Sequence, residues 1–500
     1  MAFSNSPQFQ TYKTVKIKFD GEPGFRSGDL TTQRDLQIVN MYYDQMSQEN
    51  KERIVRLMKR DGLVATAYSL SKVSNTDVIR GYFNDTETNT FYWAVNNKLY
   101  SVSPDSGTSI RTVTTLATSS GYVGFTAFRS ASTSTRYILA SDGTDLWVDN
   151  YVASTCTNVT DPDFPTPHQP YPVTIDGYVF LIKAGTEEIW NSDVDDPTAW
   201  TAGSKVNAEL ASDKGIRLFR IKNYVVCFGT SSIEYFWDAA ATPSPLSRYD
   251  SPIRNVGYIT GGTQSDDVVY FVGQDDRQNV GVYKVENFKV DRISTPVVER
   301  TIQAYSTTPN TKSNVTLNAD AFIVSSKGHS FYILVTTQTT WVYDLEAHIW
   351  YEWKGSDGTG LKVEATWAMF NGGQYVAING QQYISLLTPS AYQDFGSNFT
   401  CRYITEDNDF ETMNWKVCHR AMLKCSMHQY FGTSYAVLTW SDNDWADGGT
   451  TTARNLNVFS SSPFISKCGK FRNRSWRIEY TDNYPFFMSG LELDLNVYGV

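Results

Sequence analysis

The chain has 500 residues, of which 41% are hydrophobic, 14% aromatic and 19% charged. One hydrophobic core stops growing well below this length, so we expect a large repeat-built domain with smaller parts. The formal net charge of −10 argues against a protein that grips nucleic acid by neutralising phosphates. The first residues lack the basic and apolar segments of a signal peptide, and no run approaches the roughly 18 apolar residues of a membrane span. We therefore expect synthesis in a cytoplasm without stable membrane insertion.

The N-terminal part differs in pattern from the rest of the chain. Residues 47–63 carry Ile54, Leu57 and Met58 at helical spacing, and Ser47 is a suitable N-cap. This spacing predicts a short helix within an N-terminal extension.

A repeated unit covers most of the chain: a strand-like run, a short polar turn, and a second run that contains an aromatic residue. Aromatic markers of this unit recur about every 40–50 residues, which is the period of a four-stranded propeller blade. The markers are Tyr100, Trp147, Trp190, Tyr235, Tyr283, Tyr343 and Tyr383. We predict one β-propeller of six to eight blades, with an insertion near residues 286–330, where the interval is longest. An array of β-sandwiches with recurring hairpins is the alternative.

Strands and turns continue to alternate after the repeats. Residues 441–452 form a polar turn-like stretch, and residues 475–480 alternate polar and apolar residues like a half-buried strand. The predicted fold is therefore all-β, with an extension or platform segment at 1–70, a β-propeller at 71–395 and a small β-sandwich-like domain at 396–500. No low-complexity segment separates these parts, so we expect them to pack as one rigid body.

Sequence motifs for phosphate cradling, serine hydrolysis, zinc proteolysis and EF-hand calcium binding are missing. Four residues near the C-terminus could supply zinc ligands: Cys418, His419, Cys425 and His428. However, Cys418 and Cys425 have opposite parity in a strand and would face opposite sides of a sheet. We expect no catalytic residue, no cofactor and no metal site, and we expect the six cysteines to be reduced thiols.

Three pairs of neighbouring aspartates raise the alternative of glycoside hydrolysis, which needs two carboxylates facing one sugar. The pairs are Asp195/Asp196, Asp266/Asp267 and Asp275/Asp276. Each pair stands between strand-like runs, where aspartate favours turns by bonding to its own backbone. We therefore interpret these aspartates as turn residues.

Basic residues gather near the C-terminus: Lys467, Lys470, Arg472, Arg474 and Arg477. We interpret them as a solvated face or a subunit contact, with a nucleic-acid patch as the alternative. The three arginines are candidates for contacts with an acidic neighbouring subunit, because arginine forms bidentate pairs with carboxylates.

A more specific pattern lies within residues 185–238. An Asp-Pro-Thr-x-Trp segment precedes a strand-like run that ends in Phe-Gly-x-x-x-Ile-Glu; the residues are Asp196, Pro197, Thr198, Trp200, Phe228, Gly229, Ile233 and Glu234. The Val-Asn-Met-Tyr stretch within residues 36–45 and the closing residues 469–495 fit the same pattern. In these three places the chain resembles the tail hub family of short-tailed, podovirus-like bacteriophages, also called packaged-DNA stabilisation proteins. The family usually has Pro-Gly where Asp61-Gly62 stands, and residues 290–330 have no counterpart in it.

The resemblance implies a structural virion protein of the phage tail rather than an enzyme. Such a hub or nozzle would assemble as a ring, expected to be a hexamer, and would close the packaged capsid below the portal-adaptor proteins. It would contact tail fibres or a tail needle and form part of the DNA ejection channel, through which genomic DNA passes without sequence recognition. A propeller glycosidase or a receptor-binding module acting on host surface polysaccharide is the alternative.

The expected ring places two demands on the chain. A closed propeller leaves few free strand edges, so residues 1–70 and 396–500 are expected to supply much of the ring contact. Because each copy is acidic, we expect a lumen lined by polar and acidic side chains. A basic lumen that holds the end of the packaged DNA is the alternative.

Overall fold

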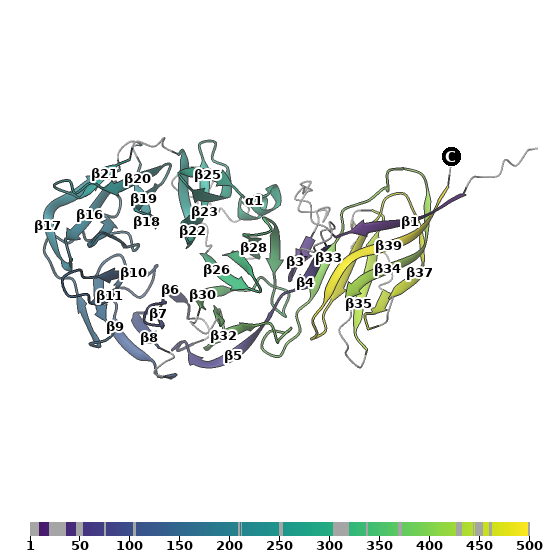
Figure 1. The fold of residues 1–500 in the computed structure, drawn as a ribbon, viewed down its shortest axis with the longest axis horizontal. Coiled ribbons are helices and arrows are strands. Elements are labelled where there is room, and N and C mark those ends of the chain that lie inside the picture. Colours follow the sequence, from purple (N-terminus) through teal and green to yellow (C-terminus); the bar gives the residue numbers. More distant parts are fainter. Residues whose placement is uncertain are drawn as a thin grey trace, which may run out of the picture.

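The computed structural model is almost entirely β-structure, arranged as a ring of sheets beside a second β-rich body (Figure 1). It describes residues 10–19, 37–46, 54–74, 77–103, 107–208, 211, 213–249, 254–303, 320–336, 339–368, 373–426, 433–443, 445, 454–459 and 463–498. Among the helices in these ranges, none is long and apolar enough to cross a membrane.

Six four-stranded sheets and the first four strands of a nine-stranded sheet surround one axis and form a seven-bladed β-propeller, within the predicted range of six to eight blades. Blade one is β6 (Ile79–Asp85), β7 (Thr90–Val95), β8 (Lys98–Val102) and β9 (Arg111–Thr115). Blade two is β10 (Gly124–Arg129), β11 (Arg136–Ser141), β12 (Leu146–Asn150) and β13 (Thr155–Asn158). Blade three is β14 (Val173–Ile175), β15 (Tyr178–Ile182), β16 (Glu188–Asp193) and β17 (Asp196–Asn207). Blade four is β18 (Gly215–Ile221), β19 (Tyr224–Gly229), β20 (Ile233–Asp238) and β21 (Leu246–Arg248). Blade five is β22 (Val256–Ser265), β23 (Val268–Asp275), β24 (Val280–Glu286) and β25 (Lys289–Arg292). Blade six is β26 (Asp320–Ser326), β27 (His329–Val335), β28 (Thr340–Asp344) and β29 (Trp350–Trp353).

The seventh blade is built from both sides of the ring. Its first three strands are β30 (Val363–Ala368), β31 (Gln374–Ile378) and β32 (Tyr383–Thr388), and its outermost strand is β5 (Gly62–Ser69) from the N-terminal part of the chain. In Figure 1 the purple β5 lies along the green β32, and the two strands pair in antiparallel register. The segment 1–70, expected to be an extension, therefore contains a propeller strand, because closing a ring by pairing removes an unsatisfied sheet edge.

Each copy of the sequence repeat corresponds to one propeller blade. All seven aromatic markers lie on the third strand of their blades, from Tyr100 on β8 to Tyr383 on β32. The longest interval holds α1 (Pro296–Gln303), which begins with proline at a favourable first helical position. The predicted insertion thus lies between β25 and β26, in part outside the described residues.

The seam where the first and seventh blades meet is packed with aromatic rings. Trp93 of β7 and Trp367 of β30 are each 1% exposed, and Phe91 stacks on Trp367 with centroids 5.0 Å apart. The indole nitrogen of Trp93 donates to the carbonyl of Leu70, directly after β5, at 2.9 Å. This cluster seals the ring at the point where its two ends join.

The second body is a two-sheet sandwich assembled from both ends of the chain. One sheet orders β3 (Met41–Met46), β4 (Ile54–Lys59), β39 (Phe487–Tyr498), β34 (Lys416–Ser426) and β37 (Phe464–Phe471), with β1 (Gln10–Lys18) also paired to β39. The other contains β2 (Gln37–Val39), β33 (Cys401–Ile404), β38 (Ser475–Tyr480), β35 (Tyr435–Ser441) and β36 (Arg454–Asn457). The second sheet continues directly from blade six, because β29 pairs with β2.

The predicted helix over residues 47–63 is wrong where the structure describes it. Residues 54–59 form strand β4, which pairs with β3 along its whole length and with β39 at Leu57 and Met58. Leu57 is 0% exposed in the sandwich core. Local helical spacing was overridden by this long-range pairing, as happens when tertiary contacts outweigh propensity; Ser47 lies outside the described residues.

Truncating Trp93 tests the importance of the seam. Trp93→Ala should lower the free energy of unfolding by about 3–5 kcal/mol, because it opens a buried cavity and removes a hydrogen bond. Trp237, on β20 and 44% exposed, supplies the matched control, since Trp237→Ala should have a small effect. Denaturant unfolding followed by circular dichroism measures both, and equal losses for the two variants would contradict the packing described above.

Candidate functional site

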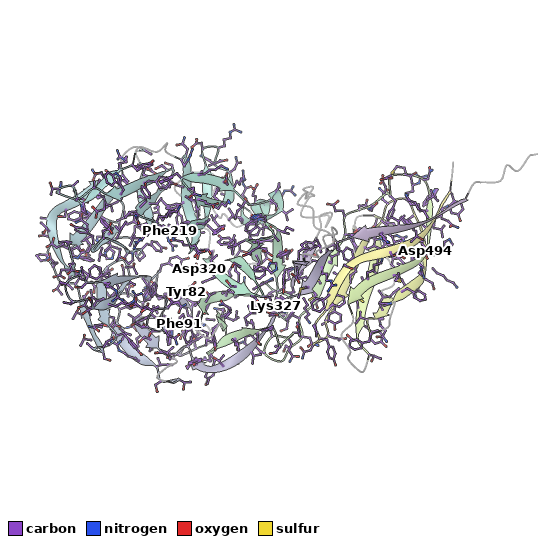
Figure 2. All side chains as sticks on the ribbon, in the orientation of Figure 1. Tyr82, Phe91, Phe219, Asp320, Lys327 and Asp494 are labelled. Carbon is purple, nitrogen blue, oxygen red and sulfur yellow. The ribbon has the colours of Figure 1, made fainter. Side chains whose placement is uncertain are left out.

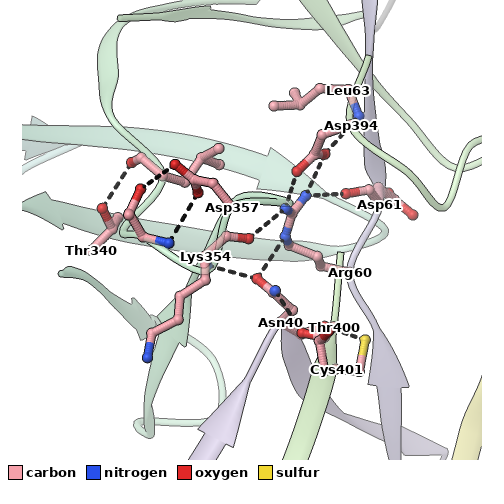
Figure 3. Close-up of polar contacts among 12 residues, drawn as sticks. Asn40, Arg60, Asp61, Leu63, Thr340, Lys354, Asp357, Asp394, Thr400 and Cys401 are labelled. Atoms are coloured by element: carbon pink, nitrogen blue, oxygen red, sulfur yellow. Dashed lines mark hydrogen bonds and ion pairs between the residues drawn. The ribbon is translucent and has the colours of Figure 1, made fainter. Parts of the chain in front are cut away.

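The chain crosses between the propeller and the sandwich twice, and both crossings meet at one place. The first crossing leads from β4 to β5 through Arg60 and Asp61, and the second leads from β32 to β33 through residues 389–400. We call the residues that join them the junction; it is drawn in Figure 3.

Arg60 lies at the centre of the junction with a side chain that is 1% exposed. Its two terminal nitrogens form a bidentate pair with Asp394 at 2.5 and 3.0 Å. The same nitrogens donate to the carbonyls of Asp61 and Lys354, and Nε donates to Oδ1 of Asn40 at 2.9 Å. All five N–H donors of this guanidinium therefore have partners, which is the condition for burying it without a large penalty.

The two charged neighbours of Arg60 extend the junction in opposite directions. Lys59 is 1% exposed and donates to the carbonyl of Asp482 in the sandwich at 2.7 Å, and burial lowers its pKa. Asp61 accepts from the hydroxyl of Ser326 at 2.6 Å and pairs with Lys327 at 2.5 Å, both in blade six. Three consecutive charged residues thus connect the sandwich, the second crossing and the propeller through hydrogen bonds and ion pairs.

Asn40 completes the junction and comes from the Val-Asn-Met-Tyr stretch. Its φ of 56° lies in the left-handed region, which asparagine tolerates better than most residues. Its backbone N–H donates to Glu352 at 2.8 Å, beside the Val39–Glu352 pairing, and its amide donates to the carbonyl of Thr400 at 2.9 Å. Asn40 thereby joins blade six to the sandwich strand that follows the second crossing.

An ion pair between a histidine and an aspartate lies beside the junction. His329 Nδ1 is 2.9 Å from Asp344, and the His329 ring contacts Tyr42 of β3 at a centroid distance of 5.1 Å. The hydrogen bond to Asp344 raises the pKa of His329. With Glu346 these residues form the group that could hold a metal ion within the described part of the chain. Backbone N–H groups already occupy carboxylate oxygens of both acids.

The propeller axis is crowded by polar and aromatic side chains, which we call the axial cluster. It comprises Tyr82, Tyr122, Tyr171, Arg217, Tyr258, Asp320 and Thr366, which lie on or just before the innermost strands of blades one to seven. Arg217 donates to the Tyr258 hydroxyl at 3.1 Å, and Tyr82 and Thr366 are hydrogen-bonded at 3.0 Å. Figure 2 shows Tyr82 and Asp320 on the inner side of the ring.

Contacts inside the axial cluster run across the ring. Tyr122, before blade two, hydrogen-bonds the side chain of Thr260 in blade five, on the far side of the axis. A DNA duplex, whose major groove alone is about 12 Å wide, cannot pass where two side chains from opposite blades touch. The axis of a single propeller is therefore not a path for double-stranded DNA.

The zinc candidates do not come together. Cys418 and Cys425 both pack on the sandwich core, so the predicted opposite orientation is wrong; a bulge between Cys418 and Arg420 changes the parity of β34. Seven residues along a strand still separate them by about 23 Å, too far to share one ion. His419 is exposed, and His428 lies outside the described residues.

The aspartate pairs lie at turns, as predicted, although Asp196 is the first residue of β17 and Asp275 the last of β23. Asp195 and Asp266 have φ values of 62° and 49° between consecutive strands of their blades. Asp195 accepts from the backbone of Ser132 at 3.0 Å, and Asp275 accepts from the backbone of Arg277 and Asn279. Their carboxylates serve loop structure.

The basic C-terminal residues have different environments. Arg474 is 1% exposed and forms a bidentate pair with Asp442 at 2.6 and 2.8 Å, so the expected contact of Arg474 with another subunit is corrected. Arg477 is half-buried against the Trp445 ring at 4.5 Å. Lys467 and Arg472 remain exposed.

A surface groove of about 440 Å³ lies between blades three and four. It is lined by Gly203, Lys205, Val206, Asn207, Pro243 and Arg248. No carboxylate lines this groove, and its two cations pair with Glu188 and Glu234. Its lining does not supply the two acids that glycoside hydrolysis requires.

Removing Arg60 tests the junction. Arg60→Ala should cost about 3–5 kcal/mol of stability, because it leaves the buried Asp394 carboxylate unpaired. The control is Arg129→Ala, which breaks an exposed ion pair with Glu87 and should cost at most about 1 kcal/mol. Comparable denaturation midpoints for the two variants would show that the junction adds no more than a surface pair.

The His329–Asp344 pair should make stability depend on pH. The pKa of His329 is raised in the folded protein, so the pair contributes its full stabilisation below about pH 6.5. This contribution to the free energy of unfolding is lost as the pH rises through the pKa of His329 in the folded protein. Relative to His329→Gln, the native chain should therefore lose stability across this window. Thermal unfolding of both proteins at several pH values checks it, and a constant difference would refute the assignment.

Comparison with known protein families and solved structures shows which proteins this chain is similar to. A sequence model of the family described as "Bacteriophage P22 Gp10, beta-propeller" matches residues 27–388, whereas no curated protein matches the chain. Among solved structures, the N-terminal domain of Nup159 is 10% identical with a TM-score of 0.39, covering 70% of this chain and 98% of that one. The extracellular domain of the one component system BT4673 from B. thetaiotaomicron is 8% identical with a TM-score of 0.42, covering 90% of this chain and 62% of that one. BBS1N, solved in complex with ARL6DN, is 9% identical with a TM-score of 0.37, covering 66% of this chain and 98% of that one.

The family match covers all propeller strands and also β2, β3 and β4, and it ends at Thr388, the last residue of β32. It spans well over half of the chain and includes the junction residues Asn40, Arg60 and Lys354. The residues of the Asp-Pro-Thr-x-Trp and Phe-Gly-x-x-x-Ile-Glu pattern serve packing: Trp200 and Phe228 are buried, and Glu234 pairs with Arg248. The chain belongs to the bacteriophage P22 Gp10 β-propeller family and is a structural protein of a bacteriophage.

Proposed function

We propose that this protein is a hub or nozzle subunit of a short phage tail. In this role it closes the packaged capsid below the portal-adaptor proteins, remains in the virion and forms part of the DNA ejection channel. The observation that carries the proposal is the family match over residues 27–388. The buried junction supports it, because a closure must transmit load between its parts without hinging.

The proposed channel lies between subunits, since the propeller axis is bridged by the axial cluster. A closed ring of identical copies, expected to be a hexamer, provides such a lumen. Each copy carries a net charge of −10, so a lumen of polar and acidic residues would let DNA slide without binding. Tail fibres or a tail needle would attach to outer surfaces of the ring.

An exposed surface on the sandwich fits a subunit contact. Trp415 is 42% exposed, and Lys470 and Arg472 lie 4.5 and 4.8 Å from its ring. Met413, two residues before Trp415, is 59% exposed. We call Met413, Trp415, Lys470 and Arg472 the Trp415 surface; tryptophan and arginine are the side chains most enriched at interface hot spots. An acidic face of a neighbouring copy would complement its two cations.

Trp415→Ala should weaken ring formation. If Trp415 is a hot spot, its loss should shift the assembly equilibrium by about 30-fold, the equivalent of roughly 2 kcal/mol. Trp237→Ala is the matched control, because that side chain is similarly exposed on blade four. Sedimentation velocity and electron microscopy measure the ring fraction; an unchanged fraction for Trp415→Ala would place the contact elsewhere.

The function itself is tested with capsids that are filled with DNA and carry adaptors but lack this protein. Adding the purified protein should make the packaged genome resistant to nuclease and should place a ring of density below the adaptor. A persistent monomer that leaves the genome sensitive, or that hydrolyses host polysaccharide, would overturn the proposal.

A further inference from the structure

Arg217 in the axial cluster forms no ion pair with a carboxylate of the described residues, and its hydrogen-bond partner is a tyrosine hydroxyl. Its guanidinium carbon lies 4.3 Å from the centroid of the Tyr171 ring and 4.5 Å from that of Phe219. Nη1 donates to the Tyr258 hydroxyl at 3.1 Å, whereas the buried Nε has no hydrogen-bond partner. Across the described residues, every ion pair of a propeller carboxylate engages some other cation. Arg217 is only partly buried, so its guanidinium keeps N–H donors that an anion entering from solvent can pair with.

Asp320 and its neighbour Glu364 do not fill the role of such an anion. Asp320 lies within electrostatic range of Arg217 but makes no ion pair with it, and its carboxylate accepts from the backbone of Ala321 at 2.9 Å. Glu364 is already bound by Lys72 at 2.5 Å and by Asn379 at 2.6 Å. Desolvation raises the pKa of Asp320 to about 6, so this group is partly neutral under mildly acidic conditions.

The cluster can be reached from solvent. Tyr122 is 43% exposed and contacts Tyr171 at a centroid distance of 6.2 Å, and Tyr171 in turn covers Arg217. A ligand entering past Tyr122 would meet two tyrosine rings before it meets the guanidinium. Rings that flank a cation favour a small ligand with a flat or apolar body and one anionic group.

We propose that the axial cluster is a binding site for a small oxyanion, a carboxylate or phosphate group, paired with Arg217. The planar guanidinium presents paired N–H donors that match either group. The tyrosine rings would hold whatever small body carries the charge. This site is independent of ring formation and of the proposed tail function.

Binding at this site should depend on pH through Asp320. Ionised Asp320 would repel the anion, so affinity should rise as pH falls through about 6, and the bound anion should in turn favour protonation of Asp320. The other groups that face Asp320 are Arg217 from β18, Glu364 from β30 with its partner Lys72 after β5, and the tyrosines Tyr82, Tyr122, Tyr171 and Tyr332. Burial raises the pKa values of Tyr82, Tyr122, Tyr171 and Tyr332 above 10, so these hydroxyls stay neutral in the same window.

The test is calorimetric titration of the full chain with inorganic phosphate, glucuronate and glucose at fixed ionic strength, below and above pH 6. At least one of the two anions should bind with a stoichiometry of one, and glucose should bind at least about tenfold more weakly than glucuronate. Binding of phosphate but not glucuronate identifies a phosphorylated or free phosphate ligand, and the reverse identifies a carboxylate on a sugar-like body. Failure of both anions to bind, or equal binding of glucose and glucuronate, would overturn the proposal.

Variants assign the site. Arg217→Gln should abolish anion binding, and Asp320→Asn should remove its pH dependence while keeping the affinity. Arg220→Gln is the control, because Arg220 is exposed on the same strand and bonds the carbonyl of Thr174. If Arg217→Gln fails to fold, Arg217→Lys keeps the charge and should bind more weakly than the native chain. Unchanged affinity in a folded Arg217 variant would contradict the assignment.

Discussion

The burial of Arg60 is the constraint on which the rest of the structure depends. A guanidinium at 1% exposure is tolerable only when every donor is paired, and the partners of Arg60 come from four separated stretches of chain. Asn40 precedes it, Asp61 follows it, and Lys354 and Asp394 belong to blade six and the second crossing. Satisfying one side chain therefore fixes the positions of the sandwich, the propeller and both connections between them.

This arrangement explains why the propeller is closed by an N-terminal strand. Directly after Arg60 and Asp61 the chain enters β5, and Gly62 sits so close to Gln393 that an added Cβ would lie 2.3 Å from its carbonyl oxygen. Only glycine allows this approach, which places β5 along β32. The closed ring and the shared sheet through β29 and β2 then leave no linker about which the two bodies could hinge within the described residues.

Much of this fold could be read from the sequence because the blade repeats. The aromatic markers gave the period of the repeat, because each lies on the third strand of its blade; most of them pack between neighbouring sheets, whereas Tyr383 is 49% exposed. Trp93, Trp147, Phe236 and Tyr343 are buried in the cores between blades, and Trp190 is half-buried beside one. Turn aspartates such as Asp195 were also predictable, because their chemistry is local.

Features that depend on distant partners could not be read in this way. Residues 54–59 carry helical spacing but pair with β3 and, at Leu57 and Met58, with a strand nearly 430 residues away; the bulge in β34 inverted the parity argument for Cys418 and Cys425. Three successive charges at 59–61 look like a solvated turn in the sequence, yet all three are buried. The axial cluster gathers one residue from each blade, and no single segment signals it.

The central claim is that the junction makes propeller and sandwich one cooperative unit. Differential scanning calorimetry of the intact chain tests it most directly, by comparing the calorimetric enthalpy with the van't Hoff enthalpy of unfolding. We expect a single transition in which the two enthalpies agree and both bodies unfold together. Two resolved transitions, one for the propeller and one for the sandwich, would contradict the claim.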